Sequence, residues 1–354
     1  MKQILSNFSI QGAPDSVAPY GNGHINETYR VDCEGGNAYI LQKINTSIFR
    51  RPDLLMQNIR LVTDHLAKRC SSRREVLTLV PTVSGETYAA LPSGCWRVYE
   101  FVKDSACLER AETPAQFAES ATAFGRFFNQ LANFDATLLT ETIPHFHDTP
   151  ARFRALQKAI AEDTAGRVKT AGPEIEAALS HAAFVPTFAA LQAAGELPLR
   201  VTHNDTKINN VLFDRATMRG LCVIDLDTVM PGLIMNDFGD SIRFGASTAA
   251  EDEPDLSRVT VDLALYEAYL RAYLAVCGGA LTPLEVELLP VGAKMMTYEC
   301  GIRFLTDYLS GDAYFHIRFP EQNLYRARTQ LKLVSEMDRK WAEMEQIRKG
   351  AAKQ

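Results

Sequence analysis

The sequence predicts a two-lobed α+β fold, with a small β-rich N-terminal lobe over residues 1–103 and a larger, mainly helical C-terminal lobe over residues 104–354. Three observations support this prediction. Short alternating segments fill the first hundred residues, apolar residues at helical spacing dominate the rest, and two apolar strands surround a polar loop within residues 201–227. A chain of 354 residues is long enough to form two such domains.

Alternating segments separated by turns predict the N-terminal lobe. Gly21 and Gly23 lie between Val17 and the alternating segment 27–31, which predicts a β-hairpin. Glycines in such a turn let backbone N–H groups approach a phosphate, although they can also form an ordinary turn. The elements expected next are a strand over 39–45, a helix over about 52–69, and strands over 75–83, 85–91 and 95–102.

Helical spacing is found throughout the chain after residue 103. Phe117, Ala121, Phe124, Phe128 and Leu131 recur at intervals of four, three, four and three residues, which predicts a helix with one buried face. Further helices are expected within 150–195, over 255–276 and over 283–309, and the charged tail 336–354 predicts a solvated terminal helix.

The most informative stretch is Val201-Thr-His-Asn-Asp-Thr-Lys-Ile-Asn-Asn-Val-Leu-Phe-Asp214, followed by Leu221-Cys-Val-Ile-Asp-Leu-Asp227. We expect its polar side chains to gather at one end of the two strands. Phosphoryl transfer to a hydroxyl uses one carboxylate to accept the hydroxyl proton, and oxygen ligands to hold Mg²⁺ against the phosphates of ATP. The stretch therefore indicates a phosphoryl-transfer centre.

Each residue type in the stretch suits one part of that chemistry. Asp205 fits the base, whereas Asn210 and Asp225 fit the metal, with Asp227 as a further candidate ligand. Magnesium prefers one or two carboxylates together with amide, water and phosphate oxygens, so this set suits it better than histidine or cysteine would.

Two further residues of the loop are catalytic candidates. Lys207, two residues after the proposed base, can reach the transferring phosphate as a point charge. His203 is expected to organise the loop, because its ring nitrogens can hydrogen-bond the backbone. A loop of Asn, Asp and Thr can also be turn chemistry alone. The carboxylates at the end of the second strand favour the functional interpretation, because they are hard to explain as core.

A second acidic motif lies downstream. Asp237-Phe238-Gly239 matches the protein-kinase Asp-Phe-Gly string, whose aspartate binds magnesium. Here the string follows a loop-like run over 230–236 and precedes a helical-looking segment over 240–244. We therefore expect Asp237 to cap that helix or to brace the catalytic loop, and Asp225 to bind the metal.

The arrangement resembles the aminoglycoside phosphotransferase and choline kinase group, whose catalytic segment also ends in Ile-Asp-x-Asp. Within this group the chain is similar in particular to the N-acetylhexosamine 1-kinases. Three segments carry that similarity: Tyr20-Gly-Asn-Gly-His-Ile-Asn-Glu-Thr-Tyr29, Tyr39-Ile-Leu-Gln-Lys-Ile-Asn45 and Gly301-Ile-Arg-Phe-Leu-Thr-Asp-Tyr-Leu-Ser-Gly-Asp-Ala-Tyr-Phe315. The resemblance covers nearly the whole chain and implies a protein-kinase-like fold.

The phosphate-binding strand departs from the kinase pattern. A protein kinase holds the α and β phosphates with a lysine on its third strand, paired with a helix glutamate. The strand 39–45 offers Gln42 or Lys43, which strand alternation places on opposite faces. Charge favours Lys43, whereas the register of the family favours Gln42. The next helix carries Gln57 and Asn58 but no glutamate, so we expect a weaker contact in place of the ion pair.

Residues 96–102 fit the last strand of the N-terminal lobe, running into the hinge between the lobes. A plain β-strand is an equally good interpretation. In kinase-like folds the hinge backbone binds adenine, so the resemblance makes the main chain of Tyr99, Glu100, Phe101 and Val102 the adenine-binding candidate.

For the acceptor, the resemblance implies a hexosamine whose anomeric hydroxyl lies near the base. His24, Phe244, Arg303 and Tyr314 would surround it, with the aromatic rings on its apolar face and Arg303 donating to its oxygens. Structural alternatives stay open. His24 can be a hairpin residue, the aromatics can belong to the core, and Arg303 can pair with Asp307 at helical spacing.

Composition narrows the class of protein. A net charge of -6 argues against a nucleic-acid partner, and no long apolar run suggests a signal peptide or a membrane span. The seven cysteines form no Cys-x-x-Cys pair and are odd in number, which favours free thiols. We expect a cytoplasmic protein that binds small molecules, and nothing in the sequence implies a protein partner.

The sequence therefore predicts a kinase that uses ATP and Mg²⁺ to phosphorylate the anomeric C1 hydroxyl of N-acetylglucosamine or N-acetylgalactosamine. One alternative is a related kinase of choline, an aminoglycoside, methylthioribose or homoserine, and choline or an aminoglycoside would require an acidic pocket. Another is a silent nucleotide-binding scaffold. The two hexosamines are not ranked, because one epimeric hydroxyl is distinguished by local hydrogen-bond geometry.

Overall fold

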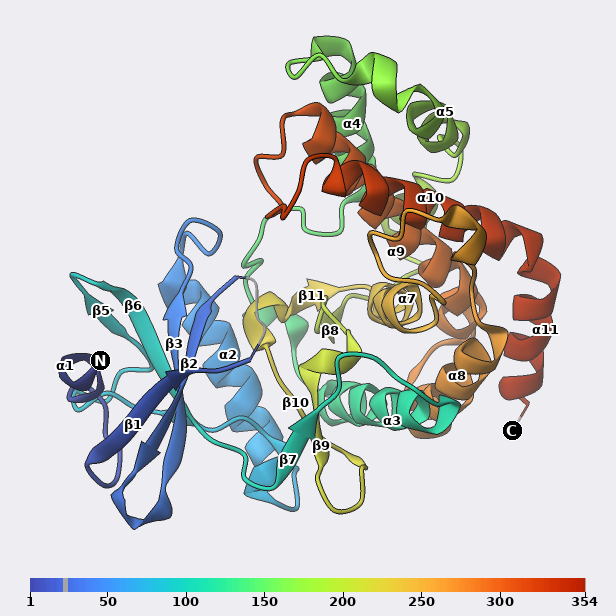
Figure 1. The fold of residues 1–354 in the computed structure, drawn as a ribbon. Helices are drawn as coiled ribbons and strands as arrows, with labels where there is room; N and C mark the ends of the chain where they lie inside the picture. Colours follow the sequence, from blue (N-terminus) through green and yellow to red (C-terminus); the bar gives the residue numbers. More distant parts are fainter. Residues whose placement is uncertain (22–24, 354) are drawn as a thin grey trace. The chain divides into compact units, whose positions relative to one another are not determined.

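A computed structural model describes residues 1–21 and 25–353 of the chain (Figure 1). The chain forms two compact units, which are described separately. The first unit comprises Met1–Cys107, Asn133–Pro144 and Val211–Pro231, and the second comprises Leu108–Ala132, His145–Asn210 and Gly232–Gln354. The first unit thus contains two segments from beyond residue 103, and the later of these carries Asp225 and Asp227.

An antiparallel sheet of six strands forms most of the first unit, in the order β1-β2-β3-β6-β4 with β5 also pairing with β6. The strands are β1 Pro14–Pro19, β2 Glu27–Cys33, β3 Ala38–Ile44, β4 Leu79–Val80, β5 Ala89–Leu91 and β6 Gly94–Glu100. The expected hairpin is formed by β1 and β2. Strands β4 and β5 are shorter than predicted, because Thr82 and Glu86 close a turn between them.

The strand register determines which side chains share a face of this sheet. Thr28, Gln42 and Arg97 lie opposite one another on β2, β3 and β6, so their side chains point to the same face. Lys43 and Trp96 form the neighbouring pair and point to the other face, where Trp96 belongs to the apolar core of the sheet.

Helix α2 (Pro52–Ala67) packs near the face that carries Arg97. It begins with Pro52 at its first turn and buries Leu55, Met56, Ile59 and other apolar residues. The sulfur of Met56 lies 3.9 Å from Nη1 of Arg97. The face that carries Gln42 and Arg97 therefore contains the buried polar groups of this sheet.

A smaller antiparallel sheet belongs to the first unit and precedes the segment that contains Asp225 and Asp227. Its order is β10-β9-β7, with β7 Ser105–Cys107, β9 Val211–Asp214 and β10 Gly220–Val223. Asp225 follows β10 with a left-handed backbone (φ 59°), and the 3-10 turn Leu226–Thr228 comes next. The chain thus turns sharply where the sequence predicted a metal ligand.

Helices make up most of the second unit. Their bounds are α3 Pro114–Leu131, α4 Thr149–Glu162, α5 Gly172–Ser180, α6 Thr187–Ala193, α7 Ile234–Gly245, α8 Leu263–Cys277, α9 Pro283–Leu309, α10 Gln322–Arg339 and α11 Trp341–Ala351. The predicted apolar face of α3 is confirmed, because all five of its predicted core residues are buried. The tail differs from the prediction, since Met344 and Ala351 of α11 are buried rather than solvated.

Helices α7 and α9 pack unusually closely. A Cβ atom at Gly239 of α7 would lie 2.2 Å from the carbonyl oxygen of Gly292 in α9. One at Gly292 would lie equally close to the carbonyl oxygen of Met235. Only glycine permits this approach of two backbones. The contact fixes the first turns of α7, which brace the catalytic loop.

Two general predictions can be compared with the structure. All seven cysteines are free thiols. Among the described residues, no helix is both long enough and apolar enough to cross a membrane.

Candidate active site

The loop that carries the predicted base lies in the second unit, between β8 (Arg200–Thr202) and the 3-10 turn Ile208–Asn210. His203 and Asn204 are buried, and Asn204 adopts a left-handed backbone with φ 64°. Asparagine tolerates this conformation better than most residues. The turn ends the strand and begins the polar segment that contains Asp205.

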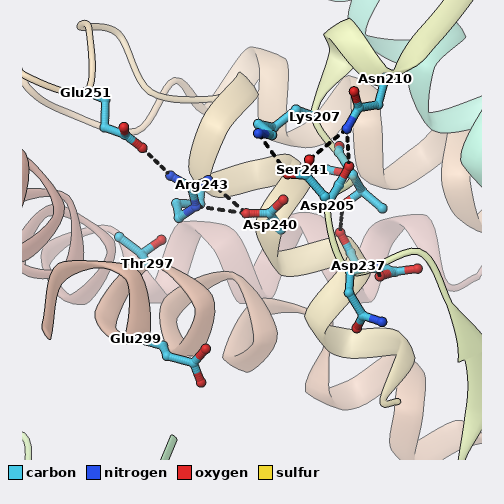
Figure 2. A network of polar contacts seen from close by, with 12 residues as sticks. Asp205, Lys207, Asn210, Asp237, Asp240, Ser241, Arg243, Glu251, Thr297 and Glu299 are labelled. Carbon is cyan, nitrogen blue, oxygen red and sulfur yellow. Dashed lines mark hydrogen bonds and ion pairs between the residues drawn. The ribbon is translucent and has the colours of Figure 1, made fainter. Parts of the chain in front are cut away.

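Helix α7 holds this loop in place (Figure 2). The two carboxylate oxygens of Asp237 accept main-chain N–H groups, from His203 at 2.8 Å and from Asn204 at 2.7 Å. One turn further along, Oγ of Ser241 donates to the carbonyl of Thr206 at 2.8 Å. The prediction that Asp237 braces the catalytic loop is confirmed. Its alternative role as a helix cap is wrong, because the N-cap of α7 lies four residues earlier.

Asp205 is held between Lys207 and Asn210 (Figure 2). Nζ of Lys207 lies 2.8 Å from Oδ1 of Asp205, and Nδ2 of Asn210 donates to Oδ2 at 2.9 Å. Burial alone would raise the pKa of Asp205, but the charge of Lys207 and these hydrogen bonds outweigh it and lower the pKa below its ordinary value. The carboxylate is therefore ionised and oriented, as a base must be.

His203 occupies the position of a loop organiser. Its ring packs edge-to-face against Phe124 and Phe127, with centroid distances of 5.5 and 5.9 Å. Its Nδ1 accepts the main-chain N–H of Asp205 at 3.3 Å. The ring therefore fixes the backbone at the base, which agrees with the role predicted for it.

A buried pair supports the same loop, formed by Glu299 of α9 and by His147, which lies just before α4. Glu299 is fully buried and lies 2.8 Å from Nδ1 of His147, and Oγ1 of Thr149 donates to its other oxygen at 2.6 Å. Burial would raise the pKa of Glu299, but His147 lowers it. The second ring nitrogen of His147 lies 3.4 Å from the carbonyl oxygen of Asn204. Sequence analysis missed this pair, because 152 residues separate its members.

The residues expected to bind Mg²⁺ come from both units. Asn210 belongs to the second unit, and its amide nitrogen also donates to the Asp205 carbonyl at 2.8 Å, which leaves Oδ1 as the atom available to a cation. Asp225 belongs to the first unit. It is exposed and lies two residues after the end of β10. An amide oxygen and an exposed carboxylate are both ligands that Mg²⁺ accepts, so the donor types fit this ion.

Asp227 differs from Asp225 because it is buried and its carboxylate contacts protein groups. Its Oδ1 lies 2.5 Å from Nη1 of Arg97, and its Oδ2 accepts from Nδ2 of Asn26 at 2.7 Å. All three side chains belong to the first unit. These contacts favour a structural role for Asp227 over the metal-binding role expected from the sequence.

Gln42 and Lys43 point to opposite faces of the sheet, as strand alternation requires. Gln42 accepts from Nε of Arg97 at 2.9 Å and donates to Oγ1 of Thr28 at 3.0 Å. Lys43 lies 3.2 Å from Glu27 and 5.9 Å from the ring centroid of Trp96. Gln42 therefore lies among the buried polar groups, whereas Lys43 forms a contact on the other face.

The main chain proposed to bind adenine lies within the described residues, and so does Gly21. Tyr99 and Glu100 lie at the end of β6, and Phe101 and Val102 follow it. The N–H groups of Glu100 and Phe101 already donate to the carbonyls of Thr78 and Ala38, both at 2.9 Å. Gly21 has a left-handed φ of 77° and open space around it, whereas Gly23 and His24 lie outside the described residues.

Two of the proposed acceptor residues lie close together in the second unit. The guanidinium of Arg303 is 6.0 Å from the ring centroid of Tyr314, and it also lies 5.2 and 5.5 Å from the rings of Phe146 and Phe315. Tyr314 is 56% exposed, so it is not a core residue. Phe244 lies half-buried near the end of α7.

An ion pair between Arg303 and Asp307, which their helical spacing allowed, is not observed. The carboxylate of Asp307 accepts the main-chain N–H groups of Tyr314 and Phe315, at 2.8 and 2.9 Å, and the side chain of Asn323. Asp307 therefore fixes the loop that follows α9. Arg303 contacts aromatic rings instead, and within the described part of the chain it has no ion-pair partner.

Arg97 is the main residue of the first unit that sequence analysis missed. It is 1% exposed and lies on β6 between Trp96 and Val98. The side chains of these two neighbours point to the opposite face of the sheet. Alternation in 96–102 places it on the same face as Tyr99, and an arginine beside apolar neighbours in a strand is a signal of a buried ion pair. Its partner Asp227 lies 130 residues further on and could not be identified from local pattern.

The two units have the features of a protein-kinase-like fold, namely an antiparallel N-terminal sheet, a mainly helical remainder and a braced loop that carries Asp205. The chain matches the phosphotransferase enzyme family (APH) over residues 16–283, and it belongs to this family. The predicted fold class is confirmed.

Solved structures agree with this fold. A microcompartment-associated aminopropanol kinase has 17% identity and a TM-score of 0.58, with 97% of each chain covered. An aminoglycoside phosphotransferase from Alicyclobacillus acidocaldarius has 13% identity and a TM-score of 0.63, covering 100% of this chain and 97% of the other. Spectinomycin phosphotransferase, solved with ADP and spectinomycin, has 13% identity and a TM-score of 0.58, covering 99% and 96%. At such identities the likeness shows the fold alone.

Proposed function

We propose that this phosphotransferase is an ATP-dependent kinase that phosphorylates the anomeric C1 hydroxyl of an N-acetylhexosamine. The observation that carries the proposal is the setting of Asp205. Its carboxylate is ionised, oriented by Lys207 and Asn210, and placed on a loop whose backbone is fixed by Asp237 and His203. Kinases place their catalytic base in this way, because their catalysis depends on position and electrostatics.

In the proposed reaction, Asp205 accepts the proton of the attacking hydroxyl through the carboxylate oxygen. The lowered pKa keeps this group ionised at neutral pH. Lys207 stays charged, because Asp205 raises its pKa above the ordinary value although burial opposes this. Its ammonium group can then stabilise the negative charge of the transferring phosphoryl group.

We assign the metal to Asn210 and Asp225, and we give Asp227 a supporting role. When bound, Mg²⁺ would neutralise negative charge on the phosphates. Asn210 is suited to its part because its amide nitrogen is engaged by Asp205, which directs Oδ1 away from the base. It would thereby couple the position of the base to that of the metal.

ATP is the proposed donor, and related structures support a nucleotide substrate. Spectinomycin phosphotransferase was solved with ADP, and amicoumacin kinase was solved with AMP-PNP and Ca²⁺. In this chain we assign adenine recognition to the main chain from Tyr99 to Val102. The Val102 amide is the best candidate, because those of Glu100 and Phe101 donate within the first unit. We place Gly21 and Gly23 at the phosphates.

The surroundings of Arg303 favour an uncharged acceptor. A cationic acceptor such as choline or an aminoglycoside requires carboxylates to meet its charge. The cluster here contains Arg303 and three aromatic rings. Burial and the charge of Arg303 lower the pKa of nearby Arg152, although the carboxylates of Glu299 and Asp148 oppose this shift. Aromatic rings and an arginine donor suit the apolar face and the oxygens of a sugar. We assign His24, Phe244, Arg303 and Tyr314 to the acceptor.

An assay of ADP release with Mg-ATP tests this proposal. The acceptors would be N-acetylglucosamine, N-acetylgalactosamine, glucose, choline, homoserine, methylthioribose and kanamycin. We expect selective turnover of the N-acetylated sugars and no turnover of their 1-deoxy analogues, which lack the reacting hydroxyl. Turnover of choline or kanamycin alone would overturn the assignment of the acceptor. The absence of magnesium-dependent ATP turnover with every acceptor would favour a silent nucleotide-binding scaffold.

A further inference from the structure

The first unit contains a buried ion pair that the proposed reaction does not use directly. The side chains of Arg97 and Asp227 are 1% and 4% exposed, and Nη1 lies 2.5 Å from Oδ1. Burying two charges is unfavourable unless each is paired and hydrogen-bonded. The pair joins β6 to the 3-10 turn that begins directly after Asp225. The free-energy cost of burying these two charges therefore points to a role of the pair in positioning that turn.

On the arginine side, the pair is anchored to the sheet. Nε of Arg97 donates to Oε1 of Gln42 at 2.9 Å, and Gln42 in turn donates to Thr28 at 3.0 Å. The three side chains come from β6, β3 and β2, and the register places them on one face. Arg97 is thus fixed across three strands.

On the aspartate side, the pair is anchored to Asn26, the residue before β2. Oδ2 of Asp227 accepts from Asn26 at 2.7 Å, and Asn26 accepts the main-chain N–H of Asn45 at 3.0 Å. The main-chain carbonyl of Asp227 accepts from Thr142 at 2.8 Å. One carboxylate therefore ties Asn26 to the segment that carries the proposed metal ligand.

Helix α2 supplies no acid to this cluster. Met56 faces Arg97, and Asn58 donates to the carbonyl of Val229 at 3.0 Å, two residues after Asp227. A protein kinase uses a strand lysine and a helix glutamate at this point. Here the strand position carries Gln42, and Lys43 contacts Glu27 on the other face.

We propose that the Arg97–Asp227 pair replaces the lysine–glutamate pair as a positioning device, which holds the Asp225 turn and Asn26 against the strand face that is proposed to receive the phosphates. Arg97 acts through Asp227 and is a positioning residue rather than a phosphate ligand. This inference rests on the proposed function, because it assumes that a metal-bound nucleotide occupies the first unit. It predicts that loss of the pair weakens binding of the metal–nucleotide complex more than binding of the free nucleotide.

The test compares the wild type with Asp227→Asn, with Arg97→Lys and with the double variant Arg97→Met/Asp227→Leu. The double variant replaces the buried charges by apolar groups of similar size, which generally preserves folding. The Kd of AMP-PNP would be measured by calorimetry with and without Mg²⁺, and thermal unfolding would be followed by circular dichroism. Arg51→Met is the control, because it removes an Arg–Asp pair of the first unit (Arg51–Asp53, 2.6 Å) that lies at the start of α2.

We expect the Kd of Mg-AMP-PNP to rise at least tenfold in Asp227→Asn and in the double variant, with a smaller rise for the metal-free nucleotide. Arg97→Lys keeps the positive charge, so its Kd for Mg-AMP-PNP should rise less than in those two variants. The control should bind like the wild type. A folded double variant that binds Mg-AMP-PNP as tightly as the wild type would overturn the inference. Equal losses with and without Mg²⁺ would also overturn it, by making Arg97 a phosphate ligand.

The two proposals fail in different ways. A wild type that binds Mg-AMP-PNP but phosphorylates no N-acetylhexosamine would remove the proposed acceptor and leave the positioning role of Arg97 intact. Conversely, normal sugar phosphorylation with no effect of the double variant would remove only the positioning role.

Discussion

At the scale of single residues, the proposed chemistry centres on Asp205. Its carboxylate has a cation on one oxygen and an amide donor on the other, and the loop around it is anchored by main-chain hydrogen bonds to Asp237. These contacts hold the group in its ionised form and in one orientation. Replacing the carboxylate by an amide keeps the shape of the side chain but removes its ability to accept a proton.

Asp205→Asn is therefore expected to lower kcat by about 10²- to 10⁴-fold, the usual contribution of a general base. The Kd of the nucleotide should stay within about threefold of the wild type, because the substitution is nearly isosteric. Single-turnover kinetics and nucleotide titration on the same preparation would measure both quantities. A variant with undiminished kcat would remove Asp205 as the base.

The pKa of Asp237 gives a prediction with a definite sign. Burial raises this pKa to about 6, so the folded state binds a proton that the unfolded state has already released above about pH 4. The group therefore favours the folded state at low pH, and this contribution is lost as the pH rises through about 6. A shift of roughly two units corresponds to about 3 kcal/mol.

Asp237→Asn does not titrate, so it should be compared with the wild type across this range. As the pH rises from 4 to 7, the difference in unfolding free energy should move in favour of the variant by up to about 3 kcal/mol. Urea unfolding at each pH would measure this difference. A difference that does not change with pH would show that Asp237 does not have a raised pKa in the folded protein.

Arg303 is the residue that most directly tests the acceptor assignment. Loss of a hydrogen-bond donor to an uncharged substrate costs about 0.5–1.5 kcal/mol, so Arg303→Ala should raise the KM of the sugar by roughly 2- to 13-fold. Nucleotide affinity should not change. Arg328→Ala provides a matched control, since Arg328 also lies over an aromatic ring but pairs with Glu174. An unchanged KM for the sugar would remove Arg303 from the acceptor site.

At the scale of elements, the close contact of α7 and α9 keeps the brace in position. Gly239 lies between Asp237 and Ser241, which both hold the catalytic loop, and its Cα faces the backbone of α9. Gly239→Ala should destabilise the protein by about 1–3 kcal/mol or more, because the new methyl group meets a carbonyl that cannot move freely.

Gly350→Ala in α11 is the control for this substitution. Its new Cβ would lie 3.7 Å from the nearest side-chain atom, and alanine in a helix is more favourable than glycine by about 1 kcal/mol. Thermal unfolding should therefore show a lower Tm for Gly239→Ala and an equal or higher Tm for Gly350→Ala. Equal effects of the two substitutions would show that the α7–α9 contact is not tight.

Elements with strong local patterns could be predicted from the sequence. The spacing of Phe117, Phe124 and Phe128 marked the buried face of α3, and the long apolar segment 283–309 matches α9. The segment 75–91 was harder, because a side-chain hydrogen bond between Thr82 and Glu86 determines its turn. The burial of Met344 depends on packing between helices, which no local pattern records.

At the scale of the whole molecule, the site residues show the same limit. Asp205 and Asn210 could be proposed from the sequence because their spacing in one loop is part of a short motif. Arg97 and Asp227 are far apart in the sequence, so their pairing depends on the fold. The sequence also could not choose between Gln42 and Lys43, and the hydrogen bond from Arg97 to Gln42 now distinguishes their surroundings.

The charge around the proposed acceptor residues bears on the kind of substrate that we propose. In this chain, Arg303 lies among aromatic rings, and Glu299 is buried with His147 and Thr149. These surroundings favour an uncharged, hydroxylated acceptor.

The most direct measurement is phosphorus NMR of the product formed from Mg-ATP and N-acetylglucosamine or N-acetylgalactosamine, with wild type and Asp205→Asn in parallel. We expect the wild type to form a sugar 1-phosphate, identified by coupling of the phosphorus to the anomeric proton, and we expect Asp205→Asn to form almost none. A phosphate on any other hydroxyl, or equal product from both proteins, would contradict the proposed reaction.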